Sequence, residues 1–171
     1  MTVVVRKAEP GDAEALVALG RAVGAEPEGW LISVDGWRGS SDERRYLRAI
    51  RRYPHAAVFV AEDDEDGELV GRLSVARDRH PASYHVADLG LMVSASYRRQ
   101  GIGRALLEAA VAWAREAGVT KLELHVFPWN EPGIKLYEQF GFEREGYRKG
   151  HYRRGDGTLA DAILMAYRVT E

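Results

Sequence analysis

The stretch YRRQGIGRALL, from Tyr97 to Leu107, places two glycines and three arginines in front of an apolar, alanine-rich segment. Glycine lets a ligand approach the backbone closely, and the free N–H groups at the start of a helix carry partial positive charge. The arginine side chains add full positive charge at the same place. The combination predicts a loop that binds an anion such as a pyrophosphate, where a strand passes into a helix.

Other glycine-rich phosphate loops fit this stretch less well. A dinucleotide-binding fingerprint has a third glycine at the position that Leu106 occupies, and no Gly-Lys-Ser/Thr follows, as a P-loop would require. The pattern that remains is Arg98-x-x-Gly101-x-Gly103. The alternative without a ligand is that both glycines serve only the turn and that the arginines are solvated.

Composition limits the other chemistries open to the chain. The 171 residues carry a formal net charge of -2 and include no cysteine. A thiolate metal site, a disulfide and a cysteine nucleophile are therefore excluded. The charge offers no general attraction to nucleic acid or to an anionic membrane, and no segment approaches the length of a bilayer span. We expect a single cytoplasmic domain, 1–171, that binds no metal, nucleic acid or membrane.

The segments before the loop alternate between strand and helix patterns. Residues 2–6 predict a β-branched strand, and Asp12 is a candidate N-cap of the helix that follows. The spacing of Ser40 and Glu43 predicts a capping box ahead of a second helix. The connection between these helices has no clear periodicity, which makes it a candidate substrate loop.

The later segments continue the same alternation. Two β-rich runs joined by an acidic turn that ends at Asp66 and Gly67 predict a hairpin. The elements expected after it are a strand over 84–93, a helix to about 117, a strand over 121–127, a short helix over 131–140 and two last strands. The glycine loop therefore lies between a strand and a helix, as an anion-binding loop requires.

The succession from HVADLGLMV through the glycine loop to ALLEAAVAWAREAGVTKLELHVFPWNEPGIKLYEQFGFEREG resembles the GCN5-related N-acetyltransferase (GNAT) family. The resemblance covers essentially the full chain. It is specific from about His85 to Gly146, weaker in GDGTLADAILMAY and loose before Ala56. The stretch HVADLG resembles the branch that acetylates amino acids and small amines. One departure is Gly133, where the family more often has alanine.

The resemblance implies a fold and a co-substrate. The implied fold is a mixed, mostly antiparallel α/β sheet of about seven strands, with helices on both faces and a splay between the fourth and fifth strands. Acetyl-coenzyme A would occupy the splay. The implied cofactor-binding residues are Leu91, Met92, Val93, Arg98, Arg99, Gln100, Gly101, Ile102, Gly103, Arg104, Asn130 and Tyr137.

Acyl transfer from a thioester to an amine needs a neutral amine and a stabilised leaving thiolate. Tyr137 matches the family's tyrosine and has a hydroxyl that can protonate the sulfur, although packing on its helix is the alternative role. Asp88, His85 and His125 are candidate bases, and Asp88 ranks first through the resemblance of HVADLG. A water chain without a dedicated base is the competing hypothesis.

The acceptor is predicted from the irregular connection. Trp30 and Trp37 would supply an apolar wall for a hydrophobic or aromatic amine, with ordinary packing as the alternative. The leading function is N-acetylation of a small primary amine, foremost an amino acid or a similar compound, by direct attack in a ternary complex. Three alternatives stay open: a protein N-terminal or lysine acetyltransferase, a polyamine or aminoglycoside acetyltransferase, and a non-catalytic acyl-coenzyme A sensor. A homodimer is also left open.

Overall fold

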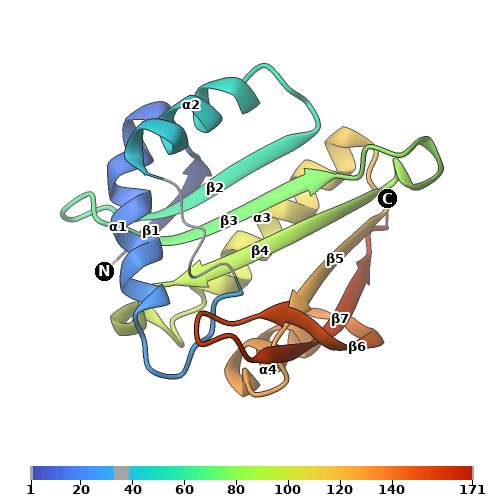
Figure 1. The fold of residues 1–171 in the computed structure, drawn as a ribbon. Coiled ribbons are helices and arrows are strands. Elements are labelled where there is room, and N and C mark those ends of the chain that lie inside the picture. Colours follow the sequence, from blue (N-terminus) through green and yellow to red (C-terminus); the bar gives the residue numbers. More distant parts are fainter. Residues whose placement is uncertain (1, 33–38, 171) are drawn as a thin grey trace.

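The computed structural model describes residues 2–32 and 39–170. In this part of the chain seven strands form one sheet, in the order β1-β2-β3-β4-β5-β7-β6 (Figure 1). The strands are β1 Val3–Lys7, β2 Ala56–Asp63, β3 Leu69–Arg77, β4 Val86–Val93, β5 Lys121–Val126, β6 Glu143–Arg153 and β7 Leu159–Arg168. Neighbouring strands are antiparallel except β4 and β5, which are parallel. The predicted fold class is confirmed.

Helices cover both faces of the sheet (Figure 1). They are α1 Ala13–Gly24, α2 Ser40–Ile50, α3 Ile102–Ala117 and α4 Glu131–Phe140. Side chains alternate along a strand, so Ala87 and Leu89 of β4 are buried in the cluster that includes α3. Met92 lies on the opposite face and packs with α1 residues. The two faces of β4 therefore have different surroundings.

The sheet opens between its two parallel strands. β4 and β5 are paired only over Val86–Asp88 and 121–123, with Asp88 opposite Glu123 as the last pair. Beyond this pair the two strands separate, as Figure 1 shows. The loop before α3 and the helix α4 follow the separated ends of the strands. This opening is the predicted splay.

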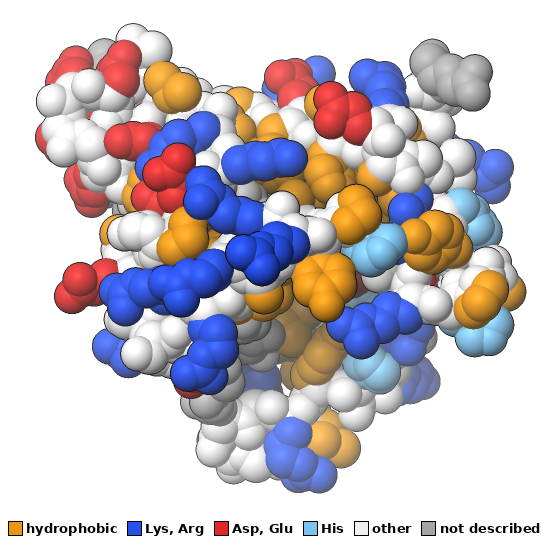
Figure 2. All heavy atoms as spheres, turned by 90° about the horizontal axis from the view of Figure 1, so that it is seen from above, with side chains coloured by type: hydrophobic (Ala, Val, Ile, Leu, Met, Phe, Trp, Pro, Cys, Tyr) orange, Lys and Arg blue, Asp and Glu red, His pale blue; other side chains and the backbone are white. Residues whose placement is uncertain are grey.

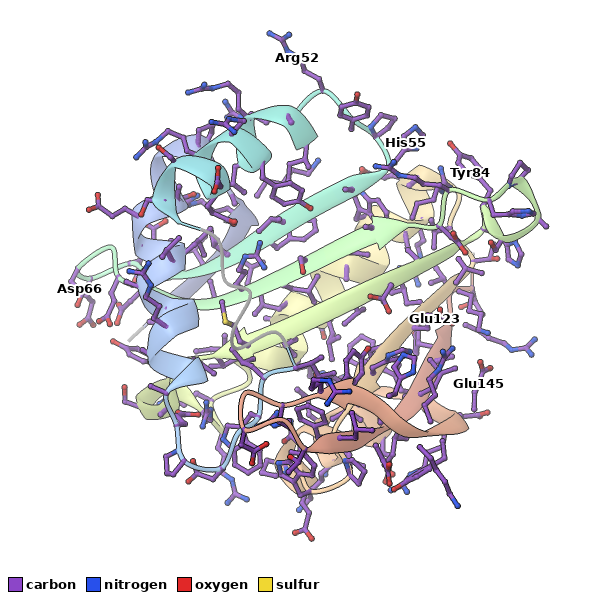
Figure 3. All side chains as sticks on the ribbon, viewed as in Figure 1. Arg52, His55, Asp66, Tyr84, Glu123 and Glu145 are labelled. Carbon is purple, nitrogen blue, oxygen red and sulfur yellow. The ribbon has the colours of Figure 1, made fainter. Side chains whose placement is uncertain are left out.

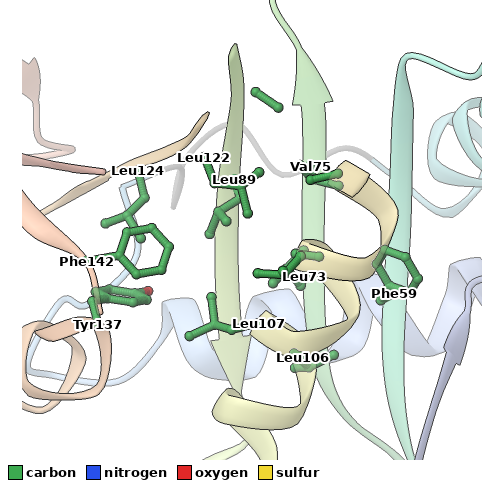
Figure 4. Packing of buried hydrophobic residues seen from close by; sticks show 14 of the residues in the cluster. Phe59, Leu73, Val75, Leu89, Leu106, Leu107, Leu122, Leu124, Tyr137 and Phe142 are labelled. Atoms are coloured by element: carbon green, nitrogen blue, oxygen red, sulfur yellow. The ribbon is translucent and has the colours of Figure 1, made fainter. Parts of the chain in front are cut away.

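The largest hydrophobic cluster fixes α3 and α4 against the sheet (Figure 4). Leu73 of β3 packs in this cluster with Leu106 and Leu107 of α3, and all three are fully buried. Full burial of a leucine side chain contributes about 1.5–3 kcal/mol. Tyr137 of α4 belongs to the same cluster and is 8% exposed. Core packing therefore holds the ring of Tyr137 in place.

The helix starts differ from the predicted caps. Asp12 occupies the N-cap of α1, but its side chain makes no capping hydrogen bond. The capping box of Ser40 and Glu43 is wrong, because Gly39 is the N-cap of α2. The Glu43 side chain is fully buried and accepts a hydrogen bond from Arg72 of β3. The Glu43 carboxylate therefore pairs with a buried arginine and does not cap the helix.

The arginines of α2 and of the turn after it lie in solvent. The exposed arginines are Arg44, Arg45, Arg48, Arg51 and Arg52. Lys and Arg side chains are prominent on the face seen in Figure 2. These arginines therefore form a solvated helix face. No helix in the described ranges, 2–32 and 39–170, is both long and apolar enough to cross a membrane.

Candidate active site

Two adjoining cavities open where β4 and β5 separate. The loop cavity, of about 570 Å³, extends from the loop before α3 along α4. The sheet cavity, of about 340 Å³, is lined by β3, β4 and β5 and by residues of α2. The residues that line both are Trp30, Leu31, Leu91, Met92, Asn130 and Tyr137. The two cavities therefore meet at the end of β4 and at Tyr137.

The loop cavity collects the predicted cofactor-binding residues. All of them except Gln100 line it. The Gln100 side chain instead donates a hydrogen bond to the carbonyl of Ser96 at 3.4 Å. Gly101 has a φ of +82° and open space where a Cβ would stand. The backbone N–H groups in the first turn of α3, which follows Gly101, have no hydrogen-bond partner within the helix. They can therefore bind an anion at this point.

The second glycine of the motif has a packing role. A Cβ on Gly103 would lie 2.7 Å from Cδ2 of Leu136, which is closer than real Cβ contacts come. Gly103 therefore permits α3 and α4 to pack closely. Leu136 also lines the loop cavity, so this helix contact shapes the cavity wall.

The loop arginines make different contacts. Nη2 of Arg98 donates to Glu26 at 2.7 Å, and its Nε donates to the carbonyl of Val93 at 3.1 Å. Arg98 therefore ties the loop to β4 and to the segment after α1. Arg104 pairs with Glu108 at 3.3 Å, with both side chains more than half exposed. Arg99 has a φ of 61° and is an exposed part of the loop.

Asn130 caps α4. Its Oδ1 accepts a hydrogen bond from the backbone N–H of Gly133 at 3.0 Å. A Cβ on residue 133 would lie 2.9 Å from both amide atoms of Asn130. The departure from the family pattern at Gly133 therefore has a physical reason, because glycine leaves room for this orientation of the asparagine.

Tyr137 is both packed and at the junction of the cavities. Its ring lies 5.7 Å from the ring of Phe142, edge to face (Figure 4). Burial raises the pKa of the phenol well above its ordinary value of 10.0, so the hydroxyl stays protonated at neutral pH. The two roles considered for this residue are compatible, since the ring packs in the core while the residue lines both cavities.

His125 of β5 lines the sheet cavity across the splay from β3 and β4. Its Nδ1 lies 2.5 Å from the hydroxyl of Tyr152 in β6. Desolvation is the main cause that lowers the pKa of His125 from 6.5, and charge interactions with Arg148 and His151 add to it. The imidazole is therefore neutral at neutral pH, as a proton acceptor must be.

The other two predicted bases lie outside the cavity walls. Asp88 is placed two residues before Gly90 on the same face of β4, and Gly90 lines the sheet cavity. Desolvation, followed by the charge of Glu123, raises the pKa of Asp88 to about 6, although its side chain still reaches solvent. Figure 3 labels Glu123 on β5. His85 is exposed before the start of β4, at the paired end of the splay.

The segment after α1 closes one side of both cavities. Trp30 lines both of them, as an acceptor-binding residue would, whereas Trp37 lies outside the described residues. The indole N–H of Trp129 donates to the carbonyl of Glu28 at 3.0 Å. Nη1 of Arg154 donates to the carbonyl of Leu31 at 3.5 Å. Residues far away in the sequence therefore hold this segment over the site.

Sequence reasoning missed several residues of the site. They are Arg72, Ser74 and Tyr46 in the sheet cavity, Tyr152 beside His125, and Trp129 and Arg154 under the segment after α1. Only Arg72 leaves a local signal, as a charged residue within an apolar strand. Among the described residues no group of His, Asp and Glu side chains could hold a metal ion.

The sequence is similar to that of known acetyltransferases. Residues 27–142 match the Acetyltransferase (GNAT) family. The L-amino acid N-acetyltransferase AaaT of Escherichia coli (strain K12) is 32% identical over 168 residues, which is 96% of each chain. The chain therefore belongs to the GNAT family. It is an acyl-coenzyme A-dependent N-acyltransferase of this family.

Solved structures agree with this assignment. The acetyltransferase of GNAT family from Streptococcus pneumoniae superposes with a TM-score of 0.87 at 27% identity, over 98% of this chain and 100% of that one. A GNAT superfamily phosphinothricin acetyltransferase from Sinorhizobium meliloti, solved in complex with AcCoA, has a TM-score of 0.84 at 21% identity. It covers 100% of this chain and 90% of that chain, and supports the fold alone.

Proposed function

We propose that the enzyme transfers an acetyl group from acetyl-coenzyme A to the α-amine of a free amino acid or a similar small molecule. The observation that carries the proposal is that the loop cavity and the sheet cavity meet at Tyr137. One cavity can then hold the thioester and the other the amine, with the reacting atoms at the junction. The similarity to an L-amino acid N-acetyltransferase over 96% of both chains supports this acceptor class.

The loop cavity fits the co-substrate. The open, left-handed Gly101 and the first N–H groups of α3 suit a pyrophosphate, with Arg99 and Arg104 supplying positive charge beside it. The separated end of β4, including Leu91 and Val93, lines the same cavity and would receive the extended arm. Backbone groups freed from the β4–β5 ladder can hydrogen-bond to the amides of that arm.

Tyr137 is the proposed general acid. The neutral amine attacks the acetyl carbon, a C–N bond forms and the C–S bond breaks. Tyr137 donates its phenolic proton to the departing sulfur, which its protonated state at neutral pH permits. Desolvation of the hydroxyl at the junction strengthens this hydrogen bond to a developing anion.

The amine of the acceptor must lose protons during the transfer, so the site needs a group that can accept them. His125 is neutral and lines the sheet cavity, so it can take a proton directly. Asp88 is largely ionised at neutral pH and lies near the closed end of the splay, so it can act through water. We propose His125 as the first proton acceptor and Asp88 as a second one. His85, on the exposed side before β4, has less support from its position.

The acceptor alternatives have less support than a free amino acid. A polyamine or aminoglycoside site needs unpaired negative charge, and the acidic residue among the described residues that line the sheet cavity, Glu43, is paired with Arg72. A sensor would not need Asn130 and Tyr137 at the junction of the cavities. A cytoplasmic location and a homodimer stay predictions.

The decisive experiment measures the release of coenzyme A thiol from acetyl-coenzyme A in the presence of an amine panel. The panel contains free amino acids, the matching amino-acid amides, short peptides and polyamines. We expect release with free amino acids and an N-acetyl amino acid as the product by mass spectrometry. Release with peptides or polyamines alone would assign the enzyme to one of the alternatives. Tight binding of acetyl-coenzyme A without release for any amine would support a sensor.

A further inference from the structure

Arg72 brings a permanent positive charge to the sheet cavity. It lies in the buried first part of β3, between the apolar residues Gly71 and Leu73, yet its side chain lines the cavity. Its Nη2 donates a hydrogen bond to Oε1 of Glu43 at 3.0 Å. Glu43 has no exposed surface, whereas Arg72 is 8% exposed. Arg72 is therefore the more accessible member of this ion pair.

The strand register places Arg72 beside the junction of the two cavities. In the β3–β4 pairing Arg72 lies opposite Met92, which lines both cavities. Ser74 lies opposite Gly90, and both line the sheet cavity. Adjacent strands are about 4.8 Å apart, so the base of the Arg72 side chain is one strand away from the junction. The missing side chain at Gly90 leaves room above the sheet between Ser74 and the splay.

The charge distribution in the sheet cavity suits a ligand with an anionic group near its amine. Of the described residues that line the cavity, Arg72 is the one with a fixed positive charge. The opposite wall carries His125, which is neutral. A guanidinium has five N–H donors and can hold two carboxylates at once, so its bond to Glu43 is compatible with a second carboxylate. In an α-amino acid the carboxylate is separated from the amine by one carbon, and binding it at Arg72 keeps the amine near the junction.

We propose that Arg72 binds the α-carboxylate of a free amino-acid acceptor, with the hydroxyl of Ser74 as a second donor. This inference rests on the proposed acetylation of small amines and names the part of the site that selects among them. A peptide N-terminus has a neutral amide in place of this carboxylate, and a polyamine has no carboxylate at all. Arg72 therefore makes the site specific for free amino acids over both.

The test compares three acceptors that share one side chain: L-phenylalanine, L-phenylalaninamide and phenethylamine. A charge-assisted hydrogen bond accounts for a preference of about 10- to 100-fold. The parent enzyme should show a kcat/KM ratio of this size for the amino acid over the amide, carried mainly by KM. In Glu43→Gln/Arg72→Gln, which removes both charges without leaving a buried carboxylate unpaired, the ratio should fall to within about threefold of one. Glu43→Gln alone keeps the guanidinium and should keep the preference.

A binding measurement separates failure of this inference from failure of the proposed function. Calorimetry with N-acetyl-L-phenylalanine and N-acetylphenethylamine, added to the protein loaded with coenzyme A, needs no turnover. If no amine is acetylated, the proposed function fails, while a preference for the acetylated amino acid that depends on Arg72 still supports the subsite. If the double variant melts like Glu43→Gln but keeps the parent's ratios in both assays, the inference is overturned. Arg72 and Glu43 would then serve only to tie α2 to β3.

Discussion

Asp88 lies directly opposite Glu123 at the last paired position of the parallel strands β4 and β5. Two carboxyl groups thus face the same end of the splay. Desolvation is the larger cause that raises the pKa of Asp88 to about 6, and the charge of Glu123 is the second. The strands separate immediately after this pair, so a group that titrates near neutral pH lies at the closed end of the site.

This pair predicts a pH-dependent stability. The pKa of Asp88 is higher in the folded protein than its ordinary value of 3.8, so the folded state binds the proton more tightly. The resulting stabilisation is fully present below about pH 4 and is lost as the pH rises through about 6. Asp88→Asn should therefore be more stable than the parent at pH 7.5, by about 1 kcal/mol after allowance for solvent screening.

Urea unfolding at pH 4 and at pH 7.5 measures this difference. Glu123→Gln is the matched control, because it should lower the pKa of Asp88 only in part and leave desolvation in place. A gain for Asp88→Asn that is the same at both pH values would show that the Asp88 carboxyl does not titrate as described.

The contact between Gly103 and Leu136 predicts an effect on the cofactor that a second change can relieve. Gly103→Ala should push the Leu136 side chain aside and weaken acetyl-coenzyme A binding, whereas the helix gains about 1 kcal/mol in propensity. Gly103→Ala/Leu136→Val should bind more tightly than the single variant, because valine lacks the Cδ atoms. Calorimetric Kd values decide this.

Gly101→Ala provides the contrast. The Cβ would enter open space, so the cost is the backbone strain of a positive φ, about 1–2 kcal/mol. Leu136→Val should not relieve that defect. Equal affinities of Gly103→Ala with and without Leu136→Val would mean that Leu136 is not the neighbour that matters.

The environment of His125 predicts the direction of a titration. Arg148 disfavours a second positive charge nearby and so helps to lower the pKa of His125. Arg148→Gln should move that pKa upward toward 6.5, without reaching it because desolvation stays the main cause. NMR titration of the imidazole measures the shift. A downward shift, or none, would contradict the electrostatic account of His125 as a neutral base.

Trp30 lines both cavities, so its removal should affect both substrates. Trp30→Ala should raise the amine KM and weaken acetyl-coenzyme A binding, each by about three- to tenfold, because a half-buried indole is lost from a shared wall. Steady-state kinetics and calorimetry give the two values. Trp129→Phe is the comparison variant: it keeps an aromatic ring beside Phe127 but loses the bond to Glu28, so it shows the effect of loosening the segment while Trp30 is still present. A change in amine KM alone would exclude Trp30 from the wall of the loop cavity.

Local sequence patterns predicted most of the fold. The short helix over 131–140 is confirmed, and the preceding helix, expected to end at about 117, ends at Ala117. Both helices end before glycines with positive φ, Gly118 and Gly141. The hairpin turn at Gly67, with a φ of +76°, is also confirmed. Periodicity and glycine positions are signals within a few neighbouring residues. Helix ends and hairpin turns depend only on such neighbours, so they can be predicted from the sequence.

The electrostatics of the site could not be predicted in this way. The ion pair of Arg72 and Glu43 joins residues 29 positions apart, and the bond from Arg98 to Glu26 joins residues 72 apart. Such pairs depend on strand order and register, which a local pattern does not contain. The position of Asp88 on the fourth strand could be predicted from the sequence. That Glu123 lies opposite it could not, because this depends on the register of the parallel strands β4 and β5.

The central claim concerns Tyr137, where the cavities meet, and one substitution tests it most directly. Tyr137→Phe removes the hydroxyl and keeps the ring that packs beside Phe142. Tyr167→Phe makes the same change in the same aromatic cluster, at a residue whose ring lies 5.4 Å from that of Phe142 and that is not part of either cavity wall. Both variants should melt close to the parent.

The measurement is kcat for acetyl transfer to the best amino acid of the panel, with the Kd of acetyl-coenzyme A measured alongside. The account predicts that kcat falls by about 10²- to 10⁴-fold in Tyr137→Phe, with little change in this Kd, and that Tyr167→Phe keeps the parent rate. A fall of less than about threefold in a Tyr137→Phe protein that melts like the parent would contradict the assignment of Tyr137 as the general acid.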